Sequence, residues 1–542
     1  MPMKSTSSTI IRRRSPLCRT LAALFALLLL PAFGGATSVV PTSMHIAMVV
    51  SPDMQLYPLT VMDRDALSIL DLVYDSVISI DDDNQPQPSL ATSWDVLTDG
   101  KTWLFTIREN VFFHDGRELT AYDVAATMSA IQTLANTAET PSGRGMYSEL
   151  VSVVSSWEAD NERVLRVRTN RPYYGLLYAM TFPVLQAQST HEINPPGTGP
   201  YRIDYYIPGE ALWMTGNENW WGGNPPHVGE LICDWYATAE DALRAFESED
   251  VDIVMTRSNT AARYRGTVTN RANSYTYSTR QLECLLINQS VRKLGNDVRM
   301  RQAIAHAINV SYIKLNTYQG MVQETETLQH PGSWLYNENA TRYPNDVGYD
   351  PERARNLLYD LGWMTLNERG YRTRQTDAGT EELSLRLYYY DEAGSALRKE
   401  TASQIATMLR DVGIRVLITP YDMAGATAKL TSGDFDLCLV AVNFDVTPDP
   451  YFLLHSSSGP GTGANYARYR SDDMNKILQA LRKAIDETEF QQQWYAVQRQ
   501  MAEDIPLLPL YWREGLVVTR YAYSSVRNIR EFELLKTIEL YR

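Results

Sequence analysis

Alternating apolar and polar residues mark half-buried strands along much of this chain. Trp103, Phe105 and Ile107 occupy one face of residues 94–109, because side chains two positions apart share a face of a strand. The Asp-Gly pair at 99–100 favours a hairpin turn. The same alternation predicts strands within residues 150–170 and 200–235. The apolar run at 45–50 predicts a buried strand, and a short strand is predicted over 251–254.

Apolar residues spaced three or four positions apart predict helices between these strands. Residues 65–75 carry this spacing. Thr120, with Asp123 three residues later, predicts the start of a helix that runs to about residue 134. Thr238 is expected to cap a helix over residues 239–249.

Residues 382–440 alternate between the two kinds of pattern. The predicted order is strand 382–390, helix 395–412, strand 415–418, helix 424–430 and strand 435–440. Such alternation is typical of an α/β lobe with parallel strands. Gly413 stands where the end of a helix favours a left-handed residue.

The first 36 residues have the layout of a secretory signal. Basic residues precede an apolar run at 21–30, and they are Lys4, Arg12, Arg13, Arg14 and Arg19. Gly34 and Ala36 fit the −3 and −1 positions of a cleavage after Ala36. We expect a periplasmic or otherwise extracytoplasmic protein, with an uncleaved N-terminal anchor as the alternative. Cys18 precedes the apolar run, so no lipobox cysteine is expected.

Charge and length narrow the class of protein. The 542 residues include 50 basic and 64 acidic ones, and without residues 1–36 the net charge falls from −14 to about −19. Such an acidic chain repels nucleic acid and anionic lipid, so we expect no nucleic-acid partner. A mature chain of about 506 residues is long for one core, which predicts two or three lobes.

The cysteines that remain after export are spaced too widely for a zinc site. We expect them to be small buried apolar residues, and one disulfide is the open alternative. They are Cys233, Cys284 and Cys438.

The sequence contains no recognisable catalytic or metal-binding constellation. His191 and Glu192 begin like a zinc-protease helix, but the second histidine is missing and Pro195 would break the helix. The chain also lacks a Gly-x-Ser-x-Gly nucleophile elbow and a Gly-x-x-x-x-Gly-Lys phosphate loop. We therefore predict no catalytic residues, no metal site and no cofactor.

Several motifs follow one another in a fixed order between residues 45 and 530. They include residues 88–94 (PSLATSW), 111–116 (VFFHDG), 119–124 (LTAYDV), 197–201 (GTGPY), 297–303 (DVRMRQA) and 505–511 (IPLLPLY). In this order they resemble extracytoplasmic solute-binding protein family 5, the substrate-binding proteins of peptide and nickel ABC transporters.

The resemblance implies a two-lobed, periplasmic-binding-protein-like α/β fold (type II, cluster C-like) with an extra subdomain. Hinges are expected near residues 275 and 512, with ligand held between the lobes. The expected parts are lobe I over 37–85, 192–275 and 513–542, the extra subdomain over 86–191, and lobe II over 276–512.

The function implied is the capture of short peptides by a monomeric binding protein and their delivery to ABC transporter permease subunits in the membrane. One alternative is a non-peptide solute on the same fold, such as a metal chelate, an oligosaccharide or another small molecule. A secreted hydrolase is a second alternative, and a signalling role stays open beside transport.

The family's peptide binders pair a carboxylate with the ligand's N-terminal ammonium in a Trp-x-x-Asp-Tyr-x-Asp-Pro stretch. Here Val442 occupies the Trp position, and Asp445 lies four residues before Asp449 instead of three. Either Asp445 binds the amine across a one-residue insertion, or the register slips and Phe444 or Val446 faces the cleft.

The ligand-binding candidates are therefore Asp445, Phe444 and Tyr389. Tyr389 continues the strand face of Leu383, Leu385 and Leu387, so core packing is the competing role for its ring.

Overall fold

The computed structural model describes residues 42–51, 53–138, 145–147, 149–223, 225–269, 271–340, 348–391, 396–523 and 529–537. The expected signal, residues 1–36, lies outside the described residues. Among the described helices, none has both the length and the apolar character needed to cross a membrane.

Twelve strands form the largest sheet. They are β1 (Ser43–Met48), β8 (Tyr201–Ile207), β9 (Ala211–Gly216), β10 (Glu230–Trp235), β11 (Ile253–Thr256), β12 (Asn273–Ile287), β13 (Val322–Glu324), β17 (Ser384–Tyr390), β18 (Arg415–Tyr421), β19 (Leu437–Asn443), β20 (Leu508–Thr519) and β21 (Ile529–Arg530). Their order is β18-β17-β19-β12-β20-β11-β1-β10-β9-β8, with β13 on β20 and β21 on β12.

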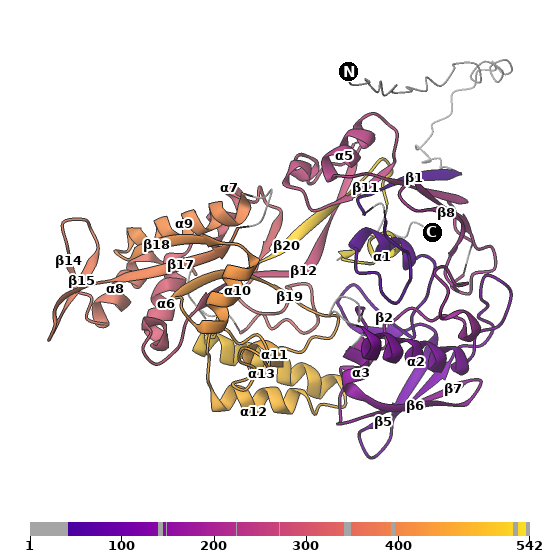
Figure 1. The fold of residues 1–542 in the computed structure, drawn as a ribbon, viewed down its shortest axis with the longest axis horizontal. Helices are drawn as coiled ribbons and strands as arrows, with labels where there is room; N and C mark the ends of the chain where they lie inside the picture. The colour runs from indigo at the N-terminus through magenta and orange to yellow at the C-terminus, as the bar shows by residue number, and fades with distance from the viewer. Residues whose placement is uncertain are drawn as a thin grey trace, which may run out of the picture. The chain divides into compact units, whose positions relative to one another are not determined.

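The long antiparallel pair β12 and β20 joins the two halves of this sheet (Figure 1). β20 also pairs with β11, and β12 also pairs with β19. The register between β12 and β20 shifts between Ser278 and Leu282. An irregularity of this kind bends a strand and changes the direction of its side chains.

Residues 384–443 form the predicted α/β unit. β17 runs parallel to both β18 and β19, and α9 (Leu397–Asp411) lies against β17 and β18 (Figure 1). α10 (Met423–Ser432) follows β18. Gly413 has a φ of 93° after α9, so the predicted strand and helix order and the left-handed glycine are confirmed.

A separate four-stranded sheet has the order β4-β5-β7-β6. Its strands are β4 (Ala91–Val96), β5 (Thr102–Ile107), β6 (Val154–Asn161) and β7 (Val164–Thr169). Trp103, Phe105 and Ile107 are buried, as predicted. α2 (Ala121–Thr137) packs on β6 and β7 (Figure 1), and Thr120 and Asp123 form its capping box.

The remaining helices and strands complete the described part of the fold. The helices are α1 (Arg64–Leu70), α3 (Glu149–Val153), α4 (Leu176–Ala179), α5 (Ala239–Glu247), α6 (Val298–Ala307), α7 (Val310–Asn316), α8 (Pro351–Asp360), α11 (Tyr451–Leu454), α12 (Asp472–Leu481), α13 (Glu487–Asp504) and α14 (Leu534–Thr537). The strands are β2 (Ile78–Ile80), β3 (Pro86–Pro88), β14 (Thr365–Leu366), β15 (Arg372–Thr376) and β16 (Gly379–Glu382).

Of two sequence predictions for these helices, one is confirmed and the other is wrong at the end of the helix. Thr238 caps α5 as predicted, since its side chain accepts a hydrogen bond from the amide of Asp241. The helix predicted over 65–75 is wrong at its end, because α1 stops at Leu70 and the chain turns at Asp71.

The cysteines within the described residues are free and buried, as expected of small apolar side chains. They are Cys233, Cys284 and Cys438. The disulfide alternative is therefore wrong for these three.

Candidate functional site

A cavity of about 450 Å³ collects residues from segments that are far apart in the sequence. This volume is within the range of small-molecule sites. Its wall includes parts of α1, β2, α4, β12, β13, β20 and β21, together with the loop after β19. The lining residues come from segments 58–84, 146–147, 178–183, 276–280, 323–335, 444–448, 512–514 and 530–533.

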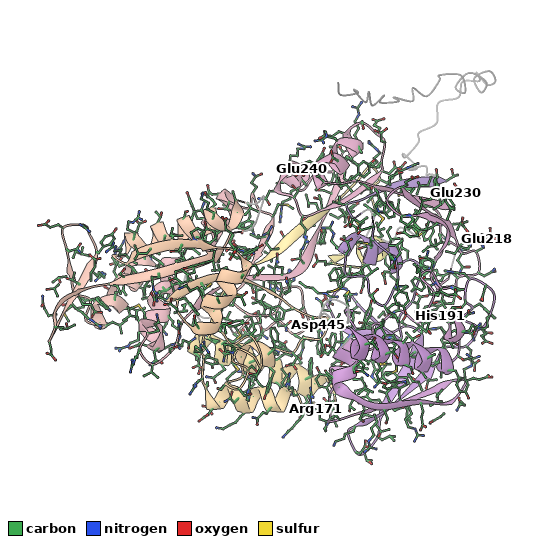
Figure 2. All side chains as sticks on the ribbon, in the orientation of Figure 1. Arg171, His191, Glu218, Glu230, Glu240 and Asp445 are labelled. Atoms are coloured by element: carbon green, nitrogen blue, oxygen red, sulfur yellow. The ribbon has the colours of Figure 1, made fainter. Side chains whose placement is uncertain are left out.

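Two of the three predicted ligand-binding residues lie on this wall. Phe444 and Asp445 follow β19 and line the cavity, and so does Val446 (Figure 2 labels Asp445). The Phe444 amide donates to the Arg280 carbonyl at 2.9 Å. The centroid of the Phe444 ring lies 5.5 Å from that of the Trp512 ring. These contacts hold the loop against the central strands.

Tyr389 lies elsewhere. Its side chain is 3% exposed, and it belongs to a core cluster that includes Leu387, Ile405 and Leu439. Tyr389 is absent from the residues that line the cavity, so the placement of its ring matches the competing role in core packing.

The two acids of the loop have different surroundings. Asp449 is engaged: its Oδ2 lies 2.6 Å from Arg482 Nε, and its Oδ1 accepts from the Tyr451 amide at 3.0 Å. Asp445 Oδ1 accepts from the Val446 amide at 2.7 Å. Within the described residues Asp445 has no ion pair, so its charge is available to a ligand.

Five other charged side chains on the wall are already paired. The pairs are Asp71 with Lys536 at 3.5 Å, Glu514 with Arg265 at 2.8 Å, Glu531 with Arg257 at 3.4 Å, and Arg530 with Glu533. An ion pair largely cancels the field that each charge presents to a ligand. The charged wall residues that lack an ion pair among the described residues are therefore the ones most able to attract a charged ligand.

Arg280 is the second charged wall residue without an ion pair in the part of the chain that the structure describes. It lies within the irregular stretch of β12, and its amide donates to Glu531 Oε2 at 2.9 Å. Its guanidinium stacks over the Phe532 ring, 4.6 Å from the centroid. Burial lowers the pKa of the Arg280 guanidinium, while Asp445 and Glu531 act to raise it.

Two residues of the wall, His330 and Trp512, also have a buried N–H group without a partner among the described residues. His330 Nδ1 accepts from the Gly332 amide at 3.1 Å, so its proton is on Nε2, which is buried and unpaired. Burial lowers the pKa of His330 to about 4, and the ring is neutral at pH 7. Trp512 Nε1 is likewise buried and unpaired.

Glu149 stands close enough to Asp445 for their charges to interact. Its Oε1 accepts from the Tyr173 hydroxyl at 3.1 Å. Burial, and then the charges of Asp445 and Asp449, raise the pKa of Glu149 to about 7. A carboxyl with a pKa of about 7 is about half protonated at neutral pH, which reduces its repulsion of Asp445.

Sequence reasoning missed Arg280, His330, Trp512 and Glu149. The one signal for Arg280 was a charged residue two positions before the mainly apolar run at 282–287, in which the structure buries every residue. Among the described residues, no group of three or more His, Cys, Asp or Glu side chains is arranged to hold a metal ion.

Known proteins resemble this chain along most of its length. Residues 85–465 match the family described as "Bacterial extracellular solute-binding proteins, family 5 Middle". The oligopeptide-binding protein AppA of Bacillus subtilis is 23% identical over 499 residues, which cover 87% of each chain. The nickel-binding periplasmic protein of Escherichia coli is 23% identical over 493 residues, covering 86% of this chain and 90% of that one.

A solved structure shares the fold. The periplasmic murein tripeptide binding protein MppA in its unliganded open form has a TM-score of 0.75 to this chain at 15% identity, covering 92% of this chain and 96% of that one. The two-lobed α/β fold predicted from the sequence is therefore confirmed.

Proposed function

Because the chain belongs to the bacterial extracellular solute-binding proteins of family 5, we propose that it captures short peptides outside the cytoplasm for an ABC importer. The observation that carries this proposal is Asp445, a carboxylate on the cavity wall without an ion pair among the described residues. A peptide's N-terminal ammonium is its natural complement, since hydrogen bonds between opposite charges are the strongest that a small ligand makes.

An irregularity in a long strand pair supports a proposed division into lobes. We propose lobe I as residues 37–85, 192–275 and 513–542, the added subdomain as 86–191 and lobe II as 276–512. The register of β12 against β20 shifts between Ser278 and Leu282, a few residues from the expected hinge near 275. Closure around a ligand would bend the chain where the ladder between β12 and β20 is interrupted.

Contacts across the proposed lobes support a closed arrangement. Trp334 of lobe II donates through Nε1 to the Asn84 carbonyl at 3.1 Å. The Tyr174 amide of the subdomain donates to the Ala484 carbonyl at 2.7 Å. A ligand that bridges the lobes would favour this state over an open one, because it binds the closed state better.

The remaining parts of the proposal follow from family membership. The protein would act as a monomer, would deliver its ligand to permease subunits in the membrane, and would make or break no bond in it. The first 36 residues are proposed to direct export and then to be removed.

Calorimetric titration of trialanine tests the proposal. Asp445→Asn keeps the side-chain shape and removes the charge, so affinity is expected to fall by roughly tenfold or more, about 1.5–3 kcal/mol. N-acetyl-trialanine lacks the ammonium, so wild-type protein should bind it more weakly than trialanine by the same factor. Asp445→Asn should bind N-acetyl-trialanine as tightly as wild type does. The control is Asp473→Asn, an exposed acid paired with Lys476 away from the cavity.

The alternatives give different results. Equal affinity of Asp445→Asn and wild type would make the Asp445 assignment wrong. Binding of nickel–histidine with no binding of trialanine would replace the peptide by a metal chelate. Recovery of peptide fragments after incubation, detected by mass spectrometry, would indicate a hydrolase.

A further inference from the structure

Four consecutive residues near the C-terminus form one side of the cavity. Residues 530–533, here called the C-terminal wall segment, all line it. Among the described residues of the wall this is the longest continuous run. The segment begins in β21, which pairs in parallel with β12 at Tyr277 and Ser278. The wall on this side is therefore built by one short piece of chain laid along a central strand.

Phe532 of this segment has a backbone conformation that bulky residues rarely adopt. Its φ is 77°, in the left-handed region, which costs free energy for a residue with a large side chain. Glycine would adopt this φ without the cost, but it would leave no ring at the cavity. The Phe532 ring lines the cavity and also packs against the largest core cluster. Strained residues of this kind concentrate at binding sites.

The residues around the ring hold the C-terminal wall segment to the strands. Glu531 is buried, accepts from the Arg280 amide at 2.9 Å and pairs with Arg257 at 3.4 Å. Arg530 and Glu533 form an ion pair with each other. The Arg280 guanidinium lies 4.6 Å from the centroid of the aromatic ring. These contacts fix the backbone on both sides of the ring.

The chain that follows the segment is anchored in lobe I. Leu534 and Leu535 are fully buried in the core, and their helix, α14, packs against α1. Lys536 lies 3.5 Å from Asp71 and 3.4 Å from the buried Asp75. Because a close-packed interior yields little to a larger guest, a wall anchored in this way resists displacement by a ligand.

We propose that the ring of Phe532 limits the size of the side chain that a captured peptide can carry at one position. This inference rests on the proposed function and specifies its ligands as peptides with a small residue at that position. A volume of about 450 Å³ holds roughly 15 non-hydrogen atoms at about 30 Å³ each, which is close to a peptide of three alanines.

Calorimetric titration compares trialanine with Phe-Ala-Ala, Ala-Phe-Ala and Ala-Ala-Phe on wild type and on Phe532→Ala. The four peptides carry the same terminal charges, so differences among them report side-chain size. Wild type should bind at least one of the phenylalanine peptides tenfold or more weakly than trialanine. Phe532→Ala should reduce that difference to threefold or less, because the space left by the ring accepts the ring of the peptide.

Two further variants separate the ring from the backbone. Phe532→Leu has a side chain of intermediate size and should give an intermediate preference, which keeps the test decisive if Phe532→Ala does not fold. Phe532→Gly also frees the backbone and should show the same preference as Phe532→Ala. Glu249→Gly is the matched control: Glu249 has a φ of 68°, is exposed and lies outside the cavity wall, so this variant should keep the preference of wild type.

Failure of the inference differs from failure of the proposed function. Equal affinity of wild type for all four peptides, or a preference for trialanine that is unchanged in the Phe532 variants, would overturn the inference alone. Absence of binding to all four peptides would overturn the proposed function and the inference together.

Discussion

Glu149→Gln tests the electrostatics beside the cavity most directly. Glu149 begins α3 and is half-buried, with the Tyr173 hydroxyl as donor to its carboxylate. Burial is the largest cause of its raised pKa, and the charge of Asp445 is the second. Glutamine has nearly the shape of the protonated acid and carries no charge, so the substitution isolates the titration.

The direction of the pH effect follows from proton binding. Glu149 in the unfolded chain has a pKa of 4.5, whereas the folded protein raises that pKa to about 7. Between these values the folded state binds more protons, so the free energy of unfolding falls as pH rises through the window. A shift from 4.5 to about 7 corresponds to about 3 kcal/mol, and partial exposure makes this an upper value.

Thermal unfolding at pH 4, 5, 6, 7 and 8 measures the effect. For 542 residues the entropy of unfolding is about 1 kcal/mol/K near the midpoint. The Tm of Glu149→Gln should therefore match that of wild type at pH 4 and exceed it by up to about 3 °C at pH 8. In an Asp445→Asn background this gap should shrink, because one cause of the raised pKa is gone.

Glu118→Gln is the matched control. Glu118 is half-buried, and the hydrogen bond from Arg163 is the largest cause that lowers its pKa, so its substitution should show no growing advantage at high pH. A Tm difference between Glu149→Gln and wild type that stays constant from pH 4 to pH 8 would refute the reasoning.

Two further predictions concern the scaffold, and denaturant unfolding checks both. Gly199→Ala should cost about 1–3 kcal/mol, because a Cβ there would lie 2.5 Å from the Leu72 carbonyl oxygen. Gly459→Ala, with open space around its Cβ position and no positive φ, should cost less, and equal costs would contradict the packing argument. Arg398→Met should cost about 3–5 kcal/mol, because it strips the buried Glu283 carboxylate of its 2.8 Å partner, and an unchanged midpoint would contradict this.

Local chemistry explains the parts of the fold that the sequence predicts well. The capping box of Thr120 and Asp123 is complete within four residues, so its signal does not depend on distant contacts. The face of Trp103, Phe105 and Ile107 similarly follows from a two-residue period. Where packing decides, prediction is less accurate: α1 ends at Leu70 although the apolar spacing continues.

The site is predictable only where its residues lie in one stretch of sequence. The motif at 444–446 is continuous in the sequence, and all three residues line the cavity, while their role in binding a ligand stays a prediction. Tyr389 illustrates the limit of such reasoning. Its alternation with Leu387 places it on a strand face, but sequence does not say whether a helix or a cavity covers that face, and in the structure the ring is in the core.

Arg280 shows why the rest of the site is hidden from the sequence. A charged side chain on a strand is most often satisfied by a neighbour, as Glu283 of β12 is by Arg398 across 115 residues of chain. Arg280 differs only because Glu531 is paired with Arg257 and Asp445 remains beyond ion-pair distance. That difference is a property of several segments taken together. The lack of an ion-pair partner for Arg280 among the described residues is therefore visible only in three dimensions.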